Sequence, residues 1–306
     1  MLTATDASAG VIHRNHDTSV AARYGAAGAF RSVGQFVVRG DGNDAWAGSG
    51  VYIGDSWVLT AAHVAENASS MTFTVNGQHR VAESTYIHPH WAGSSLLDGY
   101  DLALVKLNAD LPTITPAARM RSGRELNGKG ASIGYGRTGD AESGYSPGSS
   151  LAKRGGRNTV DSVLNNRLLL MDFDSGARTD NAMGRARAVR FEYLIAPGDS
   201  GGGMFIYDDR QWKLAGIHSF GWGVIDGQAN ASYSDVSGHV RLRFHNNWID
   251  RVLAGYDNVT LASGQTVSTR LFTASALSAV LSPEPATASL MLAALGVVAL
   301  RRRSSV

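Results

Sequence analysis

The sequence predicts an all-β protein with two packed β units and a short C-terminal helix. The chain contains 36 glycines against 7 prolines, which suits many tight turns. Short runs rich in β-branched and aromatic residues recur between Gly, Asn and Asp. These runs form two blocks of roughly 100 residues each, which indicates two barrels or sandwiches packed together.

The first block extends from about Phe36 to Lys106 and has no long stretch with helical periodicity. Its strand-sized runs are Gln35–Val38, Gly50–Ile53, Trp57–Thr60, Met71–Val75 and Leu102–Val105. We expect these runs to pair as one antiparallel unit.

The second block extends from about Ala131 to Val240. Its strand-sized runs are Ser132–Tyr135, Leu168–Met171, Gly203–Tyr207 and Leu214–Ile217. The segment Thr138–Arg157 is rich in Gly and Ser, so we expect a long surface loop there. From His239 to Leu253 the apolar residues recur at helical spacing, which predicts the C-terminal helix.

The composition excludes several functions. The chain has no cysteine, so disulfides, thiolate catalysis and Cys-ligated metals are impossible. The formal net charge is +2, which gives no reason to expect a nucleic-acid partner. The pair His88 and His90 has no convincing third ligand nearby, so we expect a loop there and neither a metal nor a cofactor.

Three segments contain residues that fit nucleophilic catalysis. Val58–Val64 delivers His63, which can move a proton near neutral pH. Asp101 precedes an apolar run and can orient an imidazole, whereas its competitor Asp98 lies further from that run. Ser200 lies between glycines in a turn where a hydroxyl can project towards a substrate. Each residue alone has a plain structural explanation, but the order His, Asp, Ser is a known triad order.

These segments resemble the chymotrypsin-like (trypsin-type) serine protease family. The segments Ala131–Gly136, Gly216–Gly221 and Trp248–Ile249 extend the similarity over roughly Gly34 to Leu253. The resemblance implies two six-stranded antiparallel β-barrels packed face to face, with a catalytic triad in the cleft between them. It implies His63 as general base, Asp101 as its orienting acid and Ser200 as nucleophile, with the N–H groups of Gly198 and Ser200 as oxyanion hole.

The same resemblance implies how substrate binds. Ser219, Phe220 and Gly221 would pair with the substrate backbone as an added strand. Leu194 lies six residues before the nucleophile, where relatives that cleave after Lys or Arg have an acid. With Gly221 and Ala231 as small walls, we expect an uncharged apolar side chain at P1, the residue before the cleaved bond.

Activation in many relatives requires a cleaved N-terminus that pairs with the acid before the nucleophile, here Asp199. Val11–Ile12 and Val20–Ala21 are the candidate segments for such an N-terminus. Met1–Gly10 has no basic start followed by an apolar stretch, so no secretory signal peptide is expected there.

The C-terminus suggests a sorting signal. Pro283–Pro285, an apolar run from Ala286 to Leu300 and the arginines Arg301–Arg303 follow one another in the order of the PEP-CTERM signal, which they resemble. That resemblance implies export to a bacterial cell surface or beyond, transient anchoring by a transmembrane helix and cleavage by a membrane processing enzyme. The apolar run is short for a membrane span, but flanking Ser and Ala residues and snorkelling arginines can extend it.

We therefore expect a monomeric, secreted serine endopeptidase acting on proteins or peptides. The predicted organisation is an N-terminal segment of unclear role (1–33), a protease domain (34–254, with barrels at about 34–120 and 121–254), a Ser/Thr/Ala-rich linker (255–282) and the sorting tail (283–306). The alternative is a catalytically inactive binding module with the protease fold at the cell surface.

Overall fold

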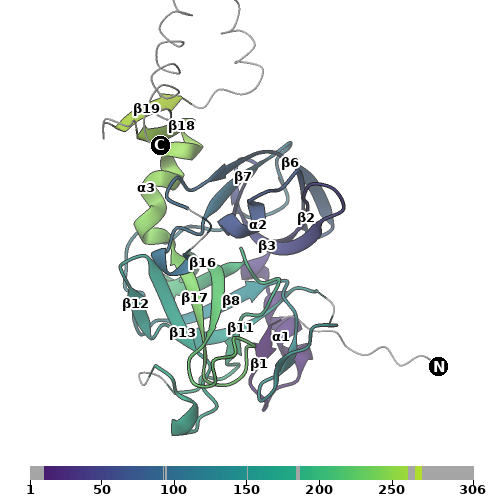
Figure 1. The fold of residues 1–306 in the computed structure, drawn as a ribbon, viewed down its shortest axis with the longest axis vertical. Coiled ribbons are helices and arrows are strands. Elements are labelled where there is room, and N and C mark those ends of the chain that lie inside the picture. Colours follow the sequence, from purple (N-terminus) through teal and green to yellow (C-terminus); the bar gives the residue numbers. More distant parts are fainter. Residues whose placement is uncertain are drawn as a thin grey trace, which may run out of the picture. The chain divides into compact units, whose positions relative to one another are not determined.

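The computed structural model describes residues 10–91, 93, 95–149, 151–183, 187–260 and 266–270 (Figure 1). The predicted sorting tail and its apolar run therefore lie outside the described residues, as does most of the predicted linker. The chain divides into two compact units, Met1–Ile249 and Asp250–Val306, which are described separately.

The first half of the larger unit is a closed antiparallel barrel of six strands, as predicted for that half. Its strands pair around the barrel in the order β2 (Val33–Arg39), β3 (Ala45–Gly54), β4 (Trp57–Thr60), β7 (Ala103–Leu107), β6 (Gln78–Ile87) and β5 (Ser70–Val75). Phe36 and Phe73 meet inside it with ring centroids 4.9 Å apart. Gly50 is required beside them, because a Cβ there would lie 2.6 Å from the Phe36 ring.

The second half differs from the predicted six-stranded barrel. It is a seven-stranded antiparallel sheet in the order β11 (Arg154–Thr159), β8 (Lys129–Gly134), β15 (Gly203–Asp208), β16 (Gln211–Gly223), β17 (Asp235–Arg241), β13 (Leu168–Asp172) and β12 (Ser162–Leu164). Within the described residues, its edge strands β11 and β12 do not pair with each other, so the sheet stays open.

Helix α1 (Thr18–Gly25) explains one open edge. It packs on β11 so closely that a Cβ on Gly25 would lie 2.6 Å from the Arg154 backbone. Asp17 caps this helix by accepting the N–H groups of Ser19 and Val20. The prediction of a loop through Arg157 is wrong, because Arg154–Thr159 pair with β8 over the whole strand.

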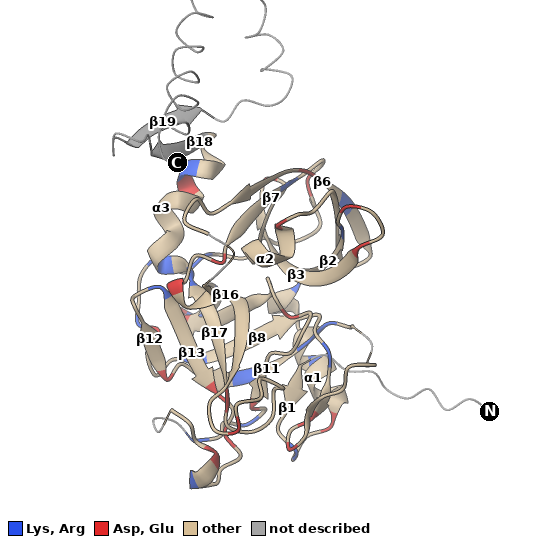
Figure 2. Cartoon of the chain, in the orientation of Figure 1, with Lys and Arg blue, Asp and Glu red and all other residues tan. Residues whose placement is uncertain are grey.

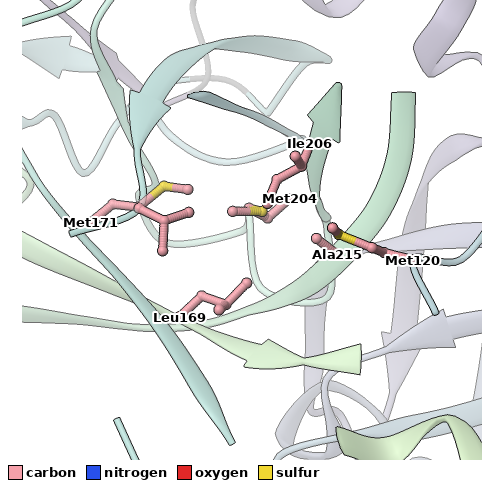
Figure 3. Packing of buried hydrophobic residues seen from close by; sticks show 7 residues of the cluster. Met120, Leu169, Met171, Met204, Ile206 and Ala215 are labelled. Carbon is pink, nitrogen blue, oxygen red and sulfur yellow. The ribbon is translucent and has the colours of Figure 1, made fainter. Parts of the chain in front are cut away.

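Methionine and aliphatic side chains fill the space beneath the seven-stranded sheet. Figure 3 shows this cluster, whose buried members are Met120, Val160, Leu169, Met171, Met204, Ile206 and Ala215. They come from strands β13, β15 and β16 and from the segments between strands, so the cluster holds distant parts of the second half together.

The remaining elements are short. They are β1 (Val11–Ile12), η1 (Gly28–Phe30), α2 (Ala62–Ala65), η2 (Leu96–Asp98), β9 (Gly139–Asp140), β10 (Gly144–Tyr145), η3 (Arg178–Asp180) and β14 (Tyr193–Leu194). β1 pairs with β14, and β9 pairs with β10.

The predicted C-terminal helix is present as α3 (Leu242–Leu253). It begins later than predicted, because β17 continues through Arg241 and His239 pairs with Leu169 and His218. In the smaller unit, β18 (Tyr256–Thr260) and β19 (Thr266–Arg270) form an antiparallel pair within the segment predicted as a linker. No helix of the described part is both long and apolar enough to cross a membrane.

Candidate active site

His63 and Asp101 are brought together by two neighbouring barrel strands. β4 ends at Thr60, and the single helical turn α2 then carries His63, whereas Asp101 stands two residues before the paired strand β7. The imidazole Nδ1 lies 2.7 Å from Oδ2 of Asp101, and the His63 backbone N–H donates to Oδ1 at 2.9 Å. Asp101 is fully buried, whereas the His63 side chain is 34% exposed.

A third group fixes the carboxylate from the second sheet. Ser219 on β16 donates its hydroxyl to Oδ2 of Asp101 at 2.5 Å. Asp101 therefore accepts three hydrogen bonds, which orient it and compensate its burial. With Nδ1–H donating to Asp101, the other imidazole nitrogen of His63 is left to accept a proton. Among the described residues no hydrogen bond joins Asp98 to His63; Asp98 lies in η2, and its backbone carbonyl accepts from Nε of Arg167.

Ser200 lies in a tight turn between β14 and β15. Gly198 and Gly201 have φ angles of +99° and +83°, in the region that favours glycine. A Cβ on Gly201 would also lie 2.1 Å from Oγ1 of Thr60, at the end of the strand that leads to His63. In the described part of the chain no hydrogen bond joins the Ser200 hydroxyl to His63, and such bonds are often long before substrate binds.

Ser49 on β3 ties this turn to the barrel. Its N–H donates to the Ser200 carbonyl at 2.7 Å, and its hydroxyl donates to the Gly198 carbonyl at 2.9 Å. The same hydroxyl accepts the N–H of Tyr135 at 2.9 Å. Sequence reasoning missed Ser49, and its only local signal is that glycines flank it on both sides.

The N–H groups predicted to form the oxyanion hole make no hydrogen bond to the described part of the protein. The N–H groups of Asp199, Gly201 and Gly202 donate to carbonyls of Ala196, His218 and Asp199, respectively. Among the described residues, the N–H groups of Gly198 and Ser200 donate to no protein group. Two free donors beside a projecting hydroxyl match what a developing oxyanion requires.

Asp199 anchors the turn from within. Its carboxylate is fully buried and accepts the N–H groups of Gly136 at 2.8 Å and Ala196 at 2.9 Å, with the Tyr193 hydroxyl at 3.4 Å. Burial raises its pKa to about 7, although these donors and Arg154 oppose that rise.

Both candidate activation segments lie in regular secondary structure. Val11–Ile12 is strand β1, buried and paired with Tyr193–Leu194. Val20–Ala21 lies in helix α1. The hydrogen bonds to the Asp199 carboxylate come from Gly136, Ala196 and Tyr193, and neither candidate segment supplies one of them.

A pocket of about 230 Å³ opens beside Ser200. It is lined by Tyr145, Leu194, Ile195, Ala196, Pro197, Ser200, Ser219, Phe220, Gly221, Ala229, Ala231 and Asp235. All of the predicted substrate-binding residues, Leu194, Ser219, Phe220, Gly221 and Ala231, are among them. Glu192 is absent from the lining and is buried instead, accepting from Asp174 and Val189.

Asp235 is the one acidic residue of the pocket lining, and sequence reasoning missed it. It is buried, and its Oδ2 accepts the N–H groups of Asn230 at 2.9 Å and Ala231 at 2.7 Å. Burial raises its pKa to about 6. No local signal distinguishes it, because only the packing of β17 against the 229–231 segment brings it to the pocket.

The histidine pair considered as a metal site has other contacts. Nε2 of His88 lies 3.3 Å from Nδ1 of His245, and Nε2 of His245 lies 2.8 Å from the Gly99 carbonyl. Burial lowers the pKa of His88 to about 3 and that of His245 to about 4. In the described ranges, no group of three or more His, Cys, Asp or Glu residues is arranged to hold a metal ion.

The comparisons with known proteins agree with this architecture. Solved structures similar in fold include HL collagenase, at 18% identity and a TM-score of 0.55 over 74% of this chain and 95% of that one. Another, GrC, has 18% identity and a TM-score of 0.52 over 73% of this chain and 94% of that one. No curated protein matches the chain.

Two family descriptions match the sequence. Residues 283–304 match the PEP-CTERM protein-sorting motif, which indicates export and sorting to the cell surface. Residues 23–249, the greater part of the chain, match the family described as Trypsin. On this match, together with the fold, the chain belongs to the trypsin family.

Proposed function

We propose that the chain is an exported serine endopeptidase that hydrolyses peptide bonds through His63, Asp101 and Ser200. The observation that carries this proposal is the His63 imidazole bonded at 2.7 Å to a fully buried carboxylate, in the same site as a serine turn with two free N–H groups. Buried acid, imidazole and free oxyanion donors serve together in acyl transfer.

The reaction proceeds in two stages. His63 takes the proton from the Ser200 hydroxyl, whose oxygen attacks the peptide carbonyl, and the resulting oxyanion accepts the N–H groups of Gly198 and Ser200. His63 then gives that proton to the leaving amine, which leaves an acyl-enzyme on Ser200. Water, deprotonated by His63, attacks the ester carbonyl, and His63 returns that proton to the Ser200 oxygen as the ester bond breaks and the acid product leaves.

The substrate backbone pairs with an open strand edge. The pairing of β16 with β15 ends at Ile217, whereas its pairing with β17 continues through Gly223. One edge of Ser219–Gly221 is therefore available for an added strand. A Cβ on Gly221 would meet no atom within 4 Å, which leaves space for substrate.

We further propose an uncharged apolar P1 side chain. Leu194, Ala196, Ala229 and Ala231 provide apolar walls. The Asp235 carboxylate is engaged by two backbone donors, so we assign it to holding the wall. Specificity constants for substrates with Phe, Leu or Lys at P1, with wild type and Asp235→Asn, test this. A preference for Lys that disappears in Asp235→Asn would refute the apolar assignment.

The tail completes the proposal. We infer that its apolar run anchors the protein transiently in a membrane and that a processing enzyme cleaves near Pro283–Pro285. The folded enzyme acts as a monomer. Size-exclusion chromatography and mass analysis of the surface-exposed protein test these points, because anchoring followed by cleavage predicts a membrane-associated precursor and a shorter released form.

Labelling with a fluorophosphonate probe tests the catalytic proposal. We expect wild type to be labelled and Ser200→Ala to remain unlabelled. A folded wild type that resists labelling would favour the inactive binding module, the alternative function for this fold. A peptide-binding measurement on the same preparation then tests that alternative directly.

A further inference from the structure

A groove that shares no lining residue with the pocket beside Ser200 combines cationic side chains with two aromatic rings, of which Tyr207 is exposed and Trp212 is half-buried. Its volume is about 500 Å³, and the residues that matter are Arg124, Lys129, Arg157, Tyr207 and Trp212. They come from three neighbouring strands, β11, β8 and β15, from β16 beyond them and from the segment before β8.

The cations of this groove are available to a ligand. Arg124 and Lys129 are exposed, and neither side chain has a hydrogen bond or ion pair in the described part of the chain. Arg157 is half-buried and is held in place by Tyr24, whose hydroxyl lies 3.1 Å from its Nε. The single acid in the lining, Asp208, is paired with Lys213 at 2.7 Å. The groove therefore carries excess positive charge.

This excess is local. Figure 2 shows Lys and Arg segments interspersed with Asp and Glu segments over the described ribbon, and the formal net charge is only +2. A general attraction to polyanions is therefore not expected, and a ligand must fit the groove itself.

The rings give the groove an apolar floor. Tyr207 is 57% exposed, and it meets Trp212 edge-on with centroids 5.4 Å apart. Trp212 is backed in turn by Phe30 at 5.4 Å, which keeps the floor rigid. Rigid aromatic rings beside unpaired cations suit a chain segment in which carboxylates stand next to an aromatic or aliphatic side chain.

The groove lies at the far end of the strand that leaves the serine turn, at Ile206–Asp208. β15 begins at Gly203, three residues after Ser200, and four residues later reaches Tyr207, a rise of about 13 Å. Because Gly203–Ile206 are buried, a bound peptide would pass over the surface rather than along the strand. An extended peptide of about eight residues spans more than about 20 Å, against that rise of about 13 Å, so one polypeptide is long enough to reach both places.

We infer that this groove is an exosite for an acidic segment of the protein substrate, a few residues away from the cleaved bond. The inference rests on the proposed peptidase function for its polypeptide ligand. Among anionic ligands we choose a polypeptide, because a single polypeptide can place an acidic segment in the groove and its own peptide bond at Ser200.

Binding is tested first without catalysis. Full-length Ser200→Ala is titrated with an Asp/Glu-rich peptide containing one Phe, and with its Gln/Asn analogue, at about 50 mM and about 500 mM NaCl. We expect the acidic peptide to bind at least about tenfold more tightly at low salt, and this difference to vanish at high salt and in Arg124→Glu/Lys129→Glu. Tyr207→Ala should weaken binding of the peptide that contains Phe and leave the affinity for a Phe→Gly peptide unchanged.

Kinetics then separate this inference from the proposed function. Cleavage of a short untailed peptide reports the active site, and the same peptide with an acidic tail about eight residues from the cleaved bond reports the groove. We expect the tail to raise kcat/KM about tenfold in wild type and not in Arg124→Glu/Lys129→Glu, with untailed cleavage unchanged. The control Arg80→Glu/Arg178→Glu makes the same charge change outside the groove and should keep the tail effect.

Three results would overturn the exosite: no tail effect in wild type on either side of the bond, an effect that persists in the groove variant, or an equal loss in the control variant. Tighter binding of polygalacturonate than of the acidic peptide would also overturn it, in favour of a polysaccharide ligand. If untailed cleavage fails while the acidic peptide binds as expected, the proposed peptidase function fails and the groove remains an acidic-peptide site.

Discussion

Replacing Glu192 by Gln should stabilise the fold at neutral pH and not at acidic pH. Glu192 is 1% exposed, and burial raises its pKa from 4.5 to about 9, with Asp174 and Asp172 adding to the rise. The folded state keeps this proton at pH 7, whereas the unfolded state releases it above pH 4.5. Stability is therefore lost as pH rises from the unfolded pKa towards the folded one.

The magnitude follows from the pH interval. From 4.5 to 7, at about 1.4 kcal/mol per pH unit, Glu192 lowers the free energy of unfolding by about 3 kcal/mol at pH 7. Glutamine does not titrate, but its amide mismatches one of the N–H groups from Asp174 and Val189, at about 1 kcal/mol. The net expected gain is about 2 kcal/mol at pH 7, with a loss of about 1 kcal/mol near pH 4.

Urea unfolding followed by tryptophan fluorescence, at about pH 4 and about pH 7, measures both differences. Glu83→Gln is the matched control, because that side chain is exposed on β6 and should change neither value. If Glu192→Gln changes the unfolding free energy equally at the two pH values, Glu192 is not protonated in the folded state and the reasoning is wrong.

Three further substitutions test the candidate site. Ser219→Ala removes the 2.5 Å donor to Asp101 and should lower kcat/KM about tenfold, measured with a short peptide. An unchanged value would mean that this bond does not orient the carboxylate. Ser49→Ala removes the hydroxyl bonds to the Gly198 carbonyl and the Tyr135 N–H, keeps the backbone bond to Ser200, and should lower kcat several-fold with little change in KM; a change in KM alone would contradict this. Gly202→Ala places a Cβ 2.5 Å from the Ile133 carbonyl, so fluorophosphonate labelling should slow sharply while the melting temperature shows whether the fold survives.

Local sequence patterns indicated five of the six strands of the first barrel and missed β6, and they also indicated the candidate catalytic residues. The apolar runs that begin at Trp57 and Leu102 are strand-sized and follow polar residues. This local pattern alone is enough to predict a strand. His63, Asp101 and Ser200 each stand at the boundary of an apolar run, where a polar residue departs from the strand pattern. Arg154–Thr159 was missed because Arg-Gly-Gly-Arg lacks strand propensity, and its pairing with β8 overrides that weakness.

The sequence by itself thus determined the fold class, the segments that carry the three candidate catalytic residues and the apolar character of Leu194 and Ala231. Tertiary structure alone decided that Ser49 holds the serine turn, that Asp235 reaches the pocket and that Glu192 is buried beside Asp174. Each of these depends on segments that only folding brings together, such as Ser49 and Gly198, which are 149 residues apart. Hydrogen bonding and desolvation act across space, so no local sequence pattern shows them.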